Sequence, residues 1–184
     1  DCKLKVNRAL MALTRNGGGP VHINLETKSS MDFSVKELPA IKPIIRTTVH
    51  DAFPKVPEGK IGIMVGAHSS FTPELTSAID KFCENYNAVV FCDQTSNYRG
   101  KYRVLAPIMG AQDKYKSVAS YIDVLIHMGE LCGAYEEYSI MTTAMNVWRL
   151  NADGMPRDQF HKLNRVFDMP EVEFFNHFNE LCTT

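Results

Sequence analysis

Cysteine is scarce in this sequence and forms no pattern typical of a metal site or a disulfide framework. The 184 residues include five cysteines, and no two of them make a CxxC pair. Disulfide-rich domains and structural zinc sites show paired or closely spaced cysteines. The odd number and wide spacing therefore predict reduced thiols, which are typical of the cytoplasm.

Neither sign of charge is in excess, and long apolar runs are absent. The 20 basic and 21 acidic residues give a formal net charge of −1. Without a basic surplus the chain cannot neutralise many phosphates, so nucleic acid is not an expected partner. No apolar stretch approaches the roughly 20 residues that span a bilayer, so a membrane is not an expected partner either.

Complete cofactor and metal motifs are also missing. The turn Gly66-Ala67-His68-Ser69-Ser70 holds one glycine, whereas the dinucleotide motif GxGxxG needs three. The six histidines are scattered, and no two of them are three or four residues apart, as two histidines of a helical metal site would be. We therefore expect no metal ion and no cofactor to bind within these 184 residues.

The sequence does contain an alternation of strand and helix patterns. Apolar runs at 60–66, 88–92 and 124–128 are typical of parallel strands that are buried on both faces. Between the first two, a helix is expected over 72–86, because Thr72-Pro73-Glu74 is a helix start and apolar residues recur every three or four positions. This order predicts an α/β fold, in which helices flank a Rossmann-like parallel sheet.

The last third of the chain continues this alternation. A helix is expected over 114–121, further strands over 147–150 and 165–167, and weak helical character over 138–144. Asp168 is expected to cap a last helix that begins near Pro170. We expect Trp148 and the phenylalanines of this last helix to lie in the core.

The first 58 residues have a different character. A helix is expected over 3–15, with Val6, Ala9, Leu10 and Leu13 on its apolar side. A glycine-rich turn ends it, and residues 21–25 alternate like a strand. Prolines and turn formers dominate the stretch that follows, which predicts a connector containing one short edge strand around Ile44 and Ile45.

Four residues are candidates for ligand binding. Ser69 and Ser70 lie in the turn before the first helix of the sheet domain, where helix amides can hold an anion. Asp93 follows the second strand, at the position of a ribose acceptor in dinucleotide-binding domains. His127 lies late in the third strand, near the edge where such sheets bind ligands. In each case the alternative is a purely structural role, and no catalytic residue is predicted.

One motif carries a specific resemblance. Gly19-Pro20-Val21-His22-Ile23-Asn24 resembles the segment that closes the N-terminal, pyrimidine-binding domain of thiamine-diphosphate-dependent enzymes, such as acetolactate synthase and pyruvate oxidase. The resemblance implies that residues 1–27 end that domain, that 28–58 form an interdomain linker, and that 59–184 form the central Rossmann-like domain. The start at Asp1, directly in a helix pattern, agrees with a piece of a longer protein.

In that family the two outer domains hold thiamine diphosphate and Mg²⁺ between them. The Gly-Asp-Gly…Asn segment that binds the metal and diphosphate does not occur in this sequence. The resemblance therefore implies that both cofactor halves lie outside this chain, that the chain alone is inactive, and that its partners are the missing N- and C-terminal domains. The parent enzyme would be a homodimer or homotetramer. No flavin is expected, because the glycines that let a flavin diphosphate approach are missing.

Within the family, the chain is most similar to the menaquinone-pathway 2-succinyl-5-enolpyruvyl-6-hydroxy-3-cyclohexene-1-carboxylate synthase. Val147-Trp148-Arg149-Leu150-Asn151 and Asp168-Met169-Pro170 resemble the end of its central domain. Gly133-Ala134-Tyr135-Glu136-Glu137 departs from it, because a basic loop is expected there. The alternatives are the central domain of an acetolactate-synthase-like or other thiamine-diphosphate decarboxylase, a free-standing nucleotide-binding module with Gly66 and Asp93 as its site, and an interaction domain without a ligand.

Overall fold

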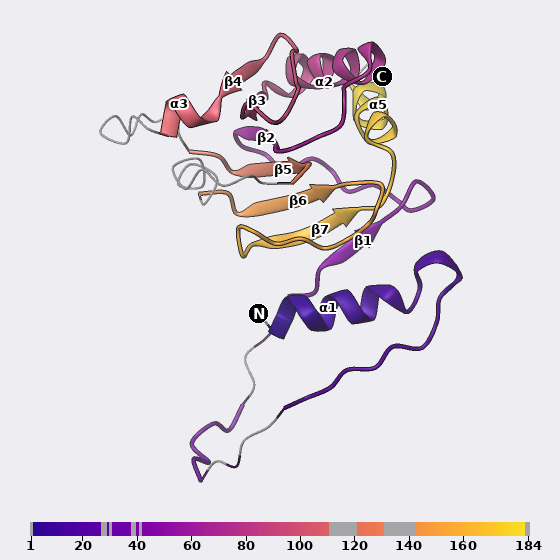
Figure 1. The fold of residues 1–184 in the computed structure, drawn as a ribbon, viewed down its shortest axis with the longest axis vertical. Coiled ribbons are helices and arrows are strands. Elements are labelled where there is room, and N and C mark those ends of the chain that lie inside the picture. The colour runs from indigo at the N-terminus through magenta and orange to yellow at the C-terminus, as the bar shows by residue number, and fades with distance from the viewer. Residues whose placement is uncertain are drawn as a thin grey trace.

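The computed structural model describes residues 2–26, 29, 31–37, 40, 42–110, 121–130 and 143–182. Their centre is a seven-stranded sheet with the order β1-β7-β6-β5-β2-β3-β4, in which every neighbouring pair is parallel (Figure 1). The strands are β1 (Ile45–Thr47), β2 (Ile61–Val65), β3 (Val89–Cys92), β4 (Arg103–Leu105), β5 (Val124–Met128), β6 (Asn146–Leu150) and β7 (Leu163–Phe167). The predicted α/β fold with a Rossmann-like parallel sheet is thus confirmed.

Two helices cover one face of this sheet and pack against each other (Figure 1). They are α2 (Pro73–Tyr86) and α5 (Glu171–Leu181). Phe174, Phe175 and Phe178 of α5 are fully buried and meet Trp148 of the sheet in one apolar core. The prediction that these aromatic residues form core is confirmed, and their burial fixes α5 across the sheet.

The ends of helix α2 are set by residues at its own termini. The Thr72 side chain accepts a hydrogen bond from the amide of Leu75, and Pro73 occupies the first turn. Proline costs nothing at that position, because its missing N–H would have no partner inside the helix. The helix ends at Asn87, which adopts the left-handed conformation with φ of 51°.

The opposite face holds a second apolar cluster, which includes Met64, Leu125 and Phe160. Leu4 and Met11 of α1 (Cys2–Ala12) pack against it. A short 3-10 helix, η1 (Arg15–Gly17), follows α1. Among the described residues, no helix has the length and apolarity needed to cross a bilayer.

The side of α1 that faces the sheet differs from the predicted one. Leu10 and Leu13 are 51% and 41% exposed, whereas Asn7 is buried and accepts a hydrogen bond from the amide of Ile44 at 2.9 Å. Its side-chain amide also donates to the carbonyl of Lys3. Because both polar groups of Asn7 have partners, it can be buried, which a hydrophobicity pattern does not anticipate.

The strand expected over residues 21–25 does not form. These residues have no strand structure, and Ile23 and Leu25 are 41% and 72% exposed. An isolated extended segment gains no ladder hydrogen bonds, and no described strand lies beside this one to supply them. The alternating pattern therefore did not identify a strand here.

The expected edge strand in the connector is confirmed as β1, which pairs with β7. The sheet therefore extends into the range 28–58 that was interpreted as a linker. Phe53, further along that range, packs against the core and stacks on His177 at 3.8 Å between ring centres.

The expected cap of the last helix is wrong. Asp168 does not cap α5, whose N-cap is Pro170, because its carboxylate accepts from Arg15 and Arg46 instead. Strand β4 and the short helix α3 (Ala106–Gly110) were not predicted, since three partly exposed residues give no clear period. The helix expected over 114–121, apart from the exposed Tyr121, and most of 138–144 lie outside the described residues.

Candidate functional site

The candidate site lies where the strand order of the sheet reverses. From β2 the chain proceeds through β3 and β4 on one side, and then through β5, β6 and β7 on the other. The carboxyl ends of β2 and β5 therefore flank the topological switch point, which is where open α/β sheets bind their ligands.

Backbone hydrogen bonds close this crevice. The amide of Ala67 donates to the carbonyl of Glu130 at 2.6 Å, and the amide of Glu130 donates back at 2.9 Å. The amide of Gly66 donates to Met128 at 3.0 Å. The amides of Gly66 and Ala67, in the turn after β2, are therefore already paired within the protein.

A shallow pocket of about 360 Å³ remains beside the closed crevice. Its lining is mostly polar and comes from the loops after β2, β5 and β6 and from the start of α5. The lining residues are Ala67, His68, Ser69, Gly129, Glu130, Asn151, Ala152 and Glu171. Ser69 is thus the predicted candidate that reaches this pocket, and Ser70 is exposed beside it.

His68 and Glu171 form an ion pair within the pocket. His68 Nε2 lies 2.9 Å from both carboxylate oxygens of Glu171, and Nδ1 lies 2.8 Å from the carbonyl of Ser69. The ring of Phe71 stacks on the imidazole at 4.3 Å. Burial lowers the pKa of His68, but the hydrogen bond and the charge of Glu171 outweigh it, so that the pKa is raised overall.

Replacing Glu171 with Gln is expected to lower the pKa of His68. In the native protein a raised pKa contributes stability that is present below the ordinary value of about 6.5 and is lost as pH rises through the raised value. In the Glu171→Gln variant, the stability that the protonated His68 contributes at low pH should be smaller. NMR titration of the His68 ring and urea unfolding across pH 5 to 8 measure both effects.

The exposed Glu173, two residues along the same helix, gives the matched control. Glu173→Gln removes the same charge without touching the imidazole, so the His68 titration should stay at its native position. An equal pKa change in both variants would contradict the pairing and point to the overall charge of the helix instead.

A buried arginine lies next to this pocket on the other face of the sheet. Arg149 of β6 is fully buried, and its guanidinium donates to the carbonyl of Gly129 and to Glu130 Oε1, the latter at 3.1 Å. Arg157 contacts the same Glu130 oxygen at 3.1 Å. Arg149 thereby holds the loop after β5 in place, although its Nε has no hydrogen-bond partner among the described residues.

His127 lies beneath this cluster rather than at an open edge. It is 1% exposed, and a guanidinium nitrogen of Arg149 lies 3.2 Å from its Nδ1. Burial, and after it the positive charges of Arg149 and Arg157, lower the pKa of His127 well below the ordinary value. His127 is therefore a neutral structural residue in the fold, and it does not line the switch-point pocket.

The carboxylate of Asp93 forms hydrogen bonds within the turn that follows β3. Its side chain accepts hydrogen bonds from the amide and the hydroxyl of Thr95, both at 2.7 Å, and it is 5% exposed. It borders a separate hollow of about 200 Å³ beside β3 and β4. The structure thus brings Ser69 to the pocket, leaves Ser70 on the surface, and places Asp93 and His127 elsewhere.

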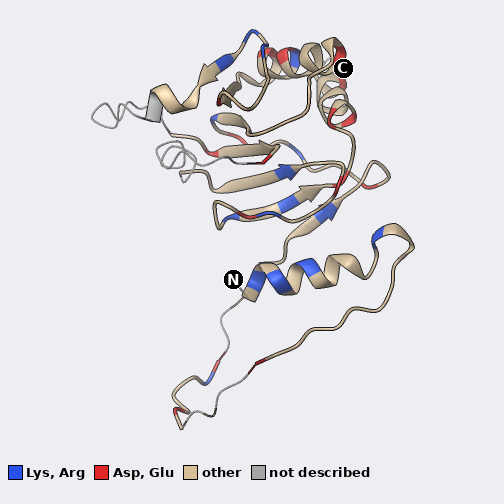
Figure 2. Ribbon diagram, in the orientation of Figure 1, with Lys and Arg blue, Asp and Glu red and all other residues tan. Residues whose placement is uncertain are grey.

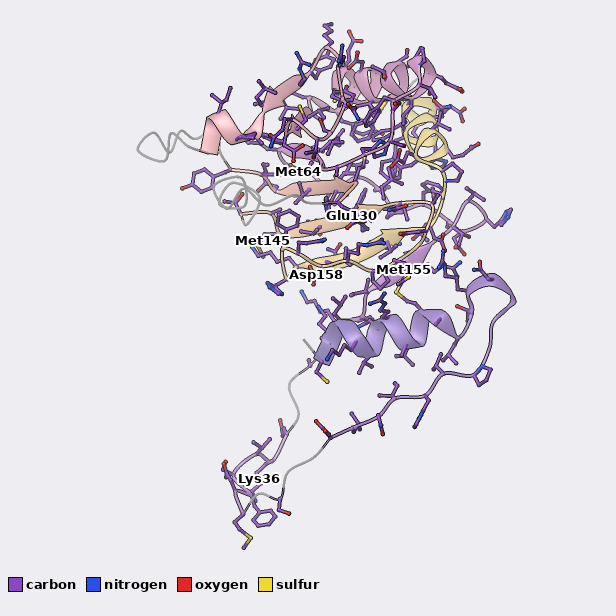
Figure 3. The ribbon with its side chains drawn as sticks, viewed as in Figure 1. Lys36, Met64, Glu130, Met145, Met155 and Asp158 are labelled. Carbon is purple, nitrogen blue, oxygen red and sulfur yellow. The ribbon has the colours of Figure 1, made fainter. Side chains whose placement is uncertain are left out.

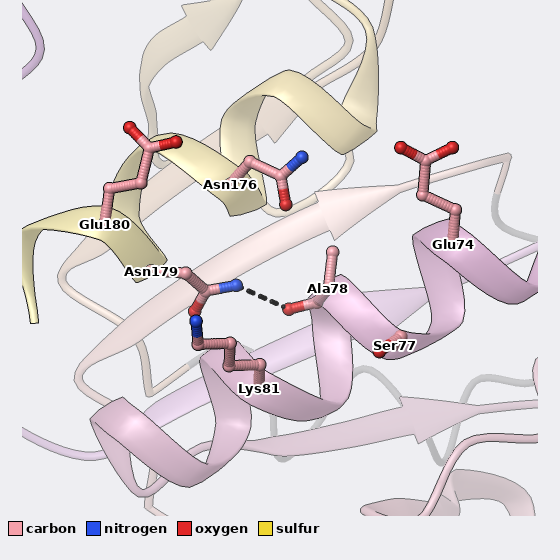
Figure 4. A pocket seen from close by; sticks show the side chains of 7 residues that line it. All are labelled: Glu74, Ser77, Ala78, Lys81, Asn176, Asn179 and Glu180. Atoms are coloured by element: carbon pink, nitrogen blue, oxygen red, sulfur yellow. Dashed lines mark hydrogen bonds between the residues drawn. The ribbon is translucent and has the colours of Figure 1, made fainter. Parts of the chain in front are cut away.

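A further hollow of about 430 Å³ lies between α2 and α5 (Figure 4). Asn179 donates to the carbonyl of Ala78 at 2.9 Å across it, and Glu74, Lys81 and Glu180 stand along its rim. The Asn179 contact joins the two helices, so this hollow is a feature of helix packing.

Sequence reasoning did not identify Glu130, Arg149 or Glu171. A usable signal existed for Arg149, because a charged residue inside an apolar strand must have buried partners. Glu171 had a weaker signal, since an acid in the first turn of a helix is common for dipole reasons alone. The loop 133–137, where the sequence departs from the thiamine-diphosphate synthase, lies outside the described residues.

Three features thus define the site: His68 is paired with the carboxylate of Glu171, His127 is buried, and the amides of Ala67 and Glu130 bond across the crevice. Comparisons with protein-family models, with curated proteins and with solved structures found no match to this chain.

Proposed function

We propose that this chain is a non-catalytic central domain of a thiamine-diphosphate-dependent 2-oxo acid decarboxylase or carboligase. Its role would be to hold the two cofactor-binding domains at a fixed spacing. The observation that carries the proposal is the closed switch point, where Ala67 and Glu130 bond to each other. Because these two amides bond across the crevice, they are not available to a ligand at the switch point, which favours a spacer over a nucleotide-binding module.

The resemblance of residues 19–24 supports the same proposal. This segment leaves η1 as an exposed, extended chain and continues into the long excursion that carries Lys36 far from the sheet (Figure 3). On this proposal thiamine diphosphate and Mg²⁺ are bound by other domains of a cytoplasmic homodimer or homotetramer. The reaction that the resemblance favours is the menaquinone-pathway synthase reaction, with acetolactate-synthase-like carboligation as the alternative.

Thermal unfolding of the 184-residue chain with added cofactors tests the spacer role. We expect no change in Tm with thiamine diphosphate and Mg²⁺, with NAD or with FAD. A nucleotide bound at a hundred times its Kd would raise Tm by roughly 5–10 °C in a domain of this size. A saturable rise with NAD or FAD would refute the spacer and favour a nucleotide-binding module.

An assay that identifies the enzyme requires the complete polypeptide that contains this sequence. Purified with thiamine diphosphate and Mg²⁺, it should release CO₂ from a 2-oxo acid, and omission of thiamine diphosphate should abolish the release. Faster release from 2-oxoglutarate than from pyruvate would favour the menaquinone-pathway reaction. Absence of any thiamine-diphosphate-dependent release would refute membership of this enzyme class.

A further inference from the structure

Another cleft lies between α1 and the connection from β6 to β7. It has a volume of about 320 Å³, and the part of the connection that forms one of its walls begins two residues after Ala152 of the switch-point pocket. Figure 3 shows Met155 in the space between the sheet and α1. The lining residues are Arg8, Met11, Ala12, Arg15, Asn16, Gly154, Met155 and Pro156.

Specific contacts hold the α1–η1 wall of this cleft against the sheet domain. Asn7 of α1 accepts from the amide of Ile44 at 2.9 Å, next to β1. At the other end of the wall, Arg15 Nε donates to Asp168 Oδ2 at 3.3 Å. Polar contacts thus fix the middle of α1 and the η1 segment that follows it against the sheet domain.

The cleft has an excess of positive charge. Asp168 Oδ2 accepts from both Arg15 and Arg46, the second at 2.7 Å, so two guanidinium groups share one carboxylate. Arg8 lines the cleft and makes no ion pair with any described residue. Helix α1 carries basic residues and no acidic one (Figure 2). The two lining arginines, Arg8 and Arg15, and the carboxylate of Asp168 leave a local charge of about +1 for an anion to neutralise.

Apart from Asn16 and the backbone of Gly154, the remaining lining is apolar. Met11, Ala12, Met155 and Pro156 supply hydrocarbon surface between the arginines. Methionine adapts its shape to a ligand because its side chain is flexible and polarisable. A volume near the lower end of the range for small-molecule sites limits the ligand to a compact molecule.

We propose that this cleft binds a small organic anion, with a carboxylate or phosphate held by Arg8 and Arg15 and a compact apolar body against Met11 and Met155. The proposal does not rest on the proposed function, because neither the spacer role nor a nucleotide site requires a ligand here. It adds a ligand-binding surface to the side of the sheet opposite the pair α2 and α5.

Calorimetric titration of the 184-residue chain with benzoate tests this proposal, with benzyl alcohol and inorganic phosphate as comparison probes. We expect saturable benzoate binding, no binding of benzyl alcohol, and weaker binding of phosphate. Arg8→Gln should weaken benzoate at least about tenfold, which is the effect of losing one charge-assisted hydrogen bond.

Lys5→Gln is the matched control, because Lys5 is an exposed cation of the same helix and does not line the cleft. It should change benzoate affinity less than twofold. Absence of saturable benzoate binding would overturn the proposal, and so would an equal loss in the Lys5 and Arg8 variants. Phosphate binding as tight as benzoate would overturn the apolar part of the assignment.

Discussion

Phe178→Ala is expected to lower the free energy of unfolding by about 3–5 kcal/mol, the usual cost of deleting a buried aromatic ring. Phe178 is fully buried, and its ring stacks toward Trp148 at 6.2 Å between centres and meets Phe174 edge-on at 4.9 Å. It also contacts rings from the connector before β2 and from α2. Because the ring joins α5, α2 and the sheet, the surrounding side chains cannot easily collapse into the space it leaves.

Urea unfolding, followed by circular dichroism, measures this loss. Phe33→Ala is the matched control, because Phe33 is 71% exposed, and surface substitutions of this kind change stability by less than about 0.5 kcal/mol. A Phe178→Ala cost no larger than that of the control would contradict the position of α5 across the sheet.

Gly129→Ala is expected to destabilise the fold by about 2–5 kcal/mol, as the sum of backbone strain and overpacking. Gly129 has φ of +68°, in the left-handed region, and a Cβ atom there would lie 2.6 Å from the carbonyl oxygen of Ala67. That oxygen accepts the hydrogen bond from Glu130. The neighbouring atom is backbone rather than a flexible side chain, so it can move only if the closed crevice opens.

Gly19→Ala provides the control for this substitution, since a Cβ atom at Gly19 meets no atom within 4 Å. Its free energy of unfolding should match that of the native chain within the error of the measurement. Hydrogen exchange at the amides of Ala67 and Glu130 reports on the crevice directly, and the Gly129 variant should exchange faster there. Unchanged exchange together with unchanged stability would contradict the closed switch point.

The elements predicted best are those whose signals are local. Strand β5 and helix α2 lie within one residue of their predicted bounds, because continuous apolar runs and a Thr-Pro-Glu start depend on neighbouring residues alone. The extended segment 21–25 failed as a strand for the complementary reason. Its alternation is local, but sheet pairing needs a second strand whose position the pattern does not contain.

The candidate site was less accessible to prediction than the fold. Ser69 was placed correctly in the turn after β2, yet its pocket depends on Glu171, which is 103 residues from His68 in the sequence. Asp93 has the expected position after β3, but its carboxylate accepts a hydrogen bond from the amide of Thr95. A single sequence gives the place of a residue along a strand but not the partners that compete for its side chain.

The sequence by itself determined the α/β class, the central strands and the aromatic composition of the core, because hydrophobic period and helix-start residues act over a few positions. Only the tertiary structure decided that the loops after β2 and β5 bond to each other, that Asn7 rather than Leu10 faces the sheet, and that Asp168 joins Arg15 across 153 residues. These contacts depend on which polar groups lie close enough to pair once the sheet has formed. A single sequence does not contain those distances in space.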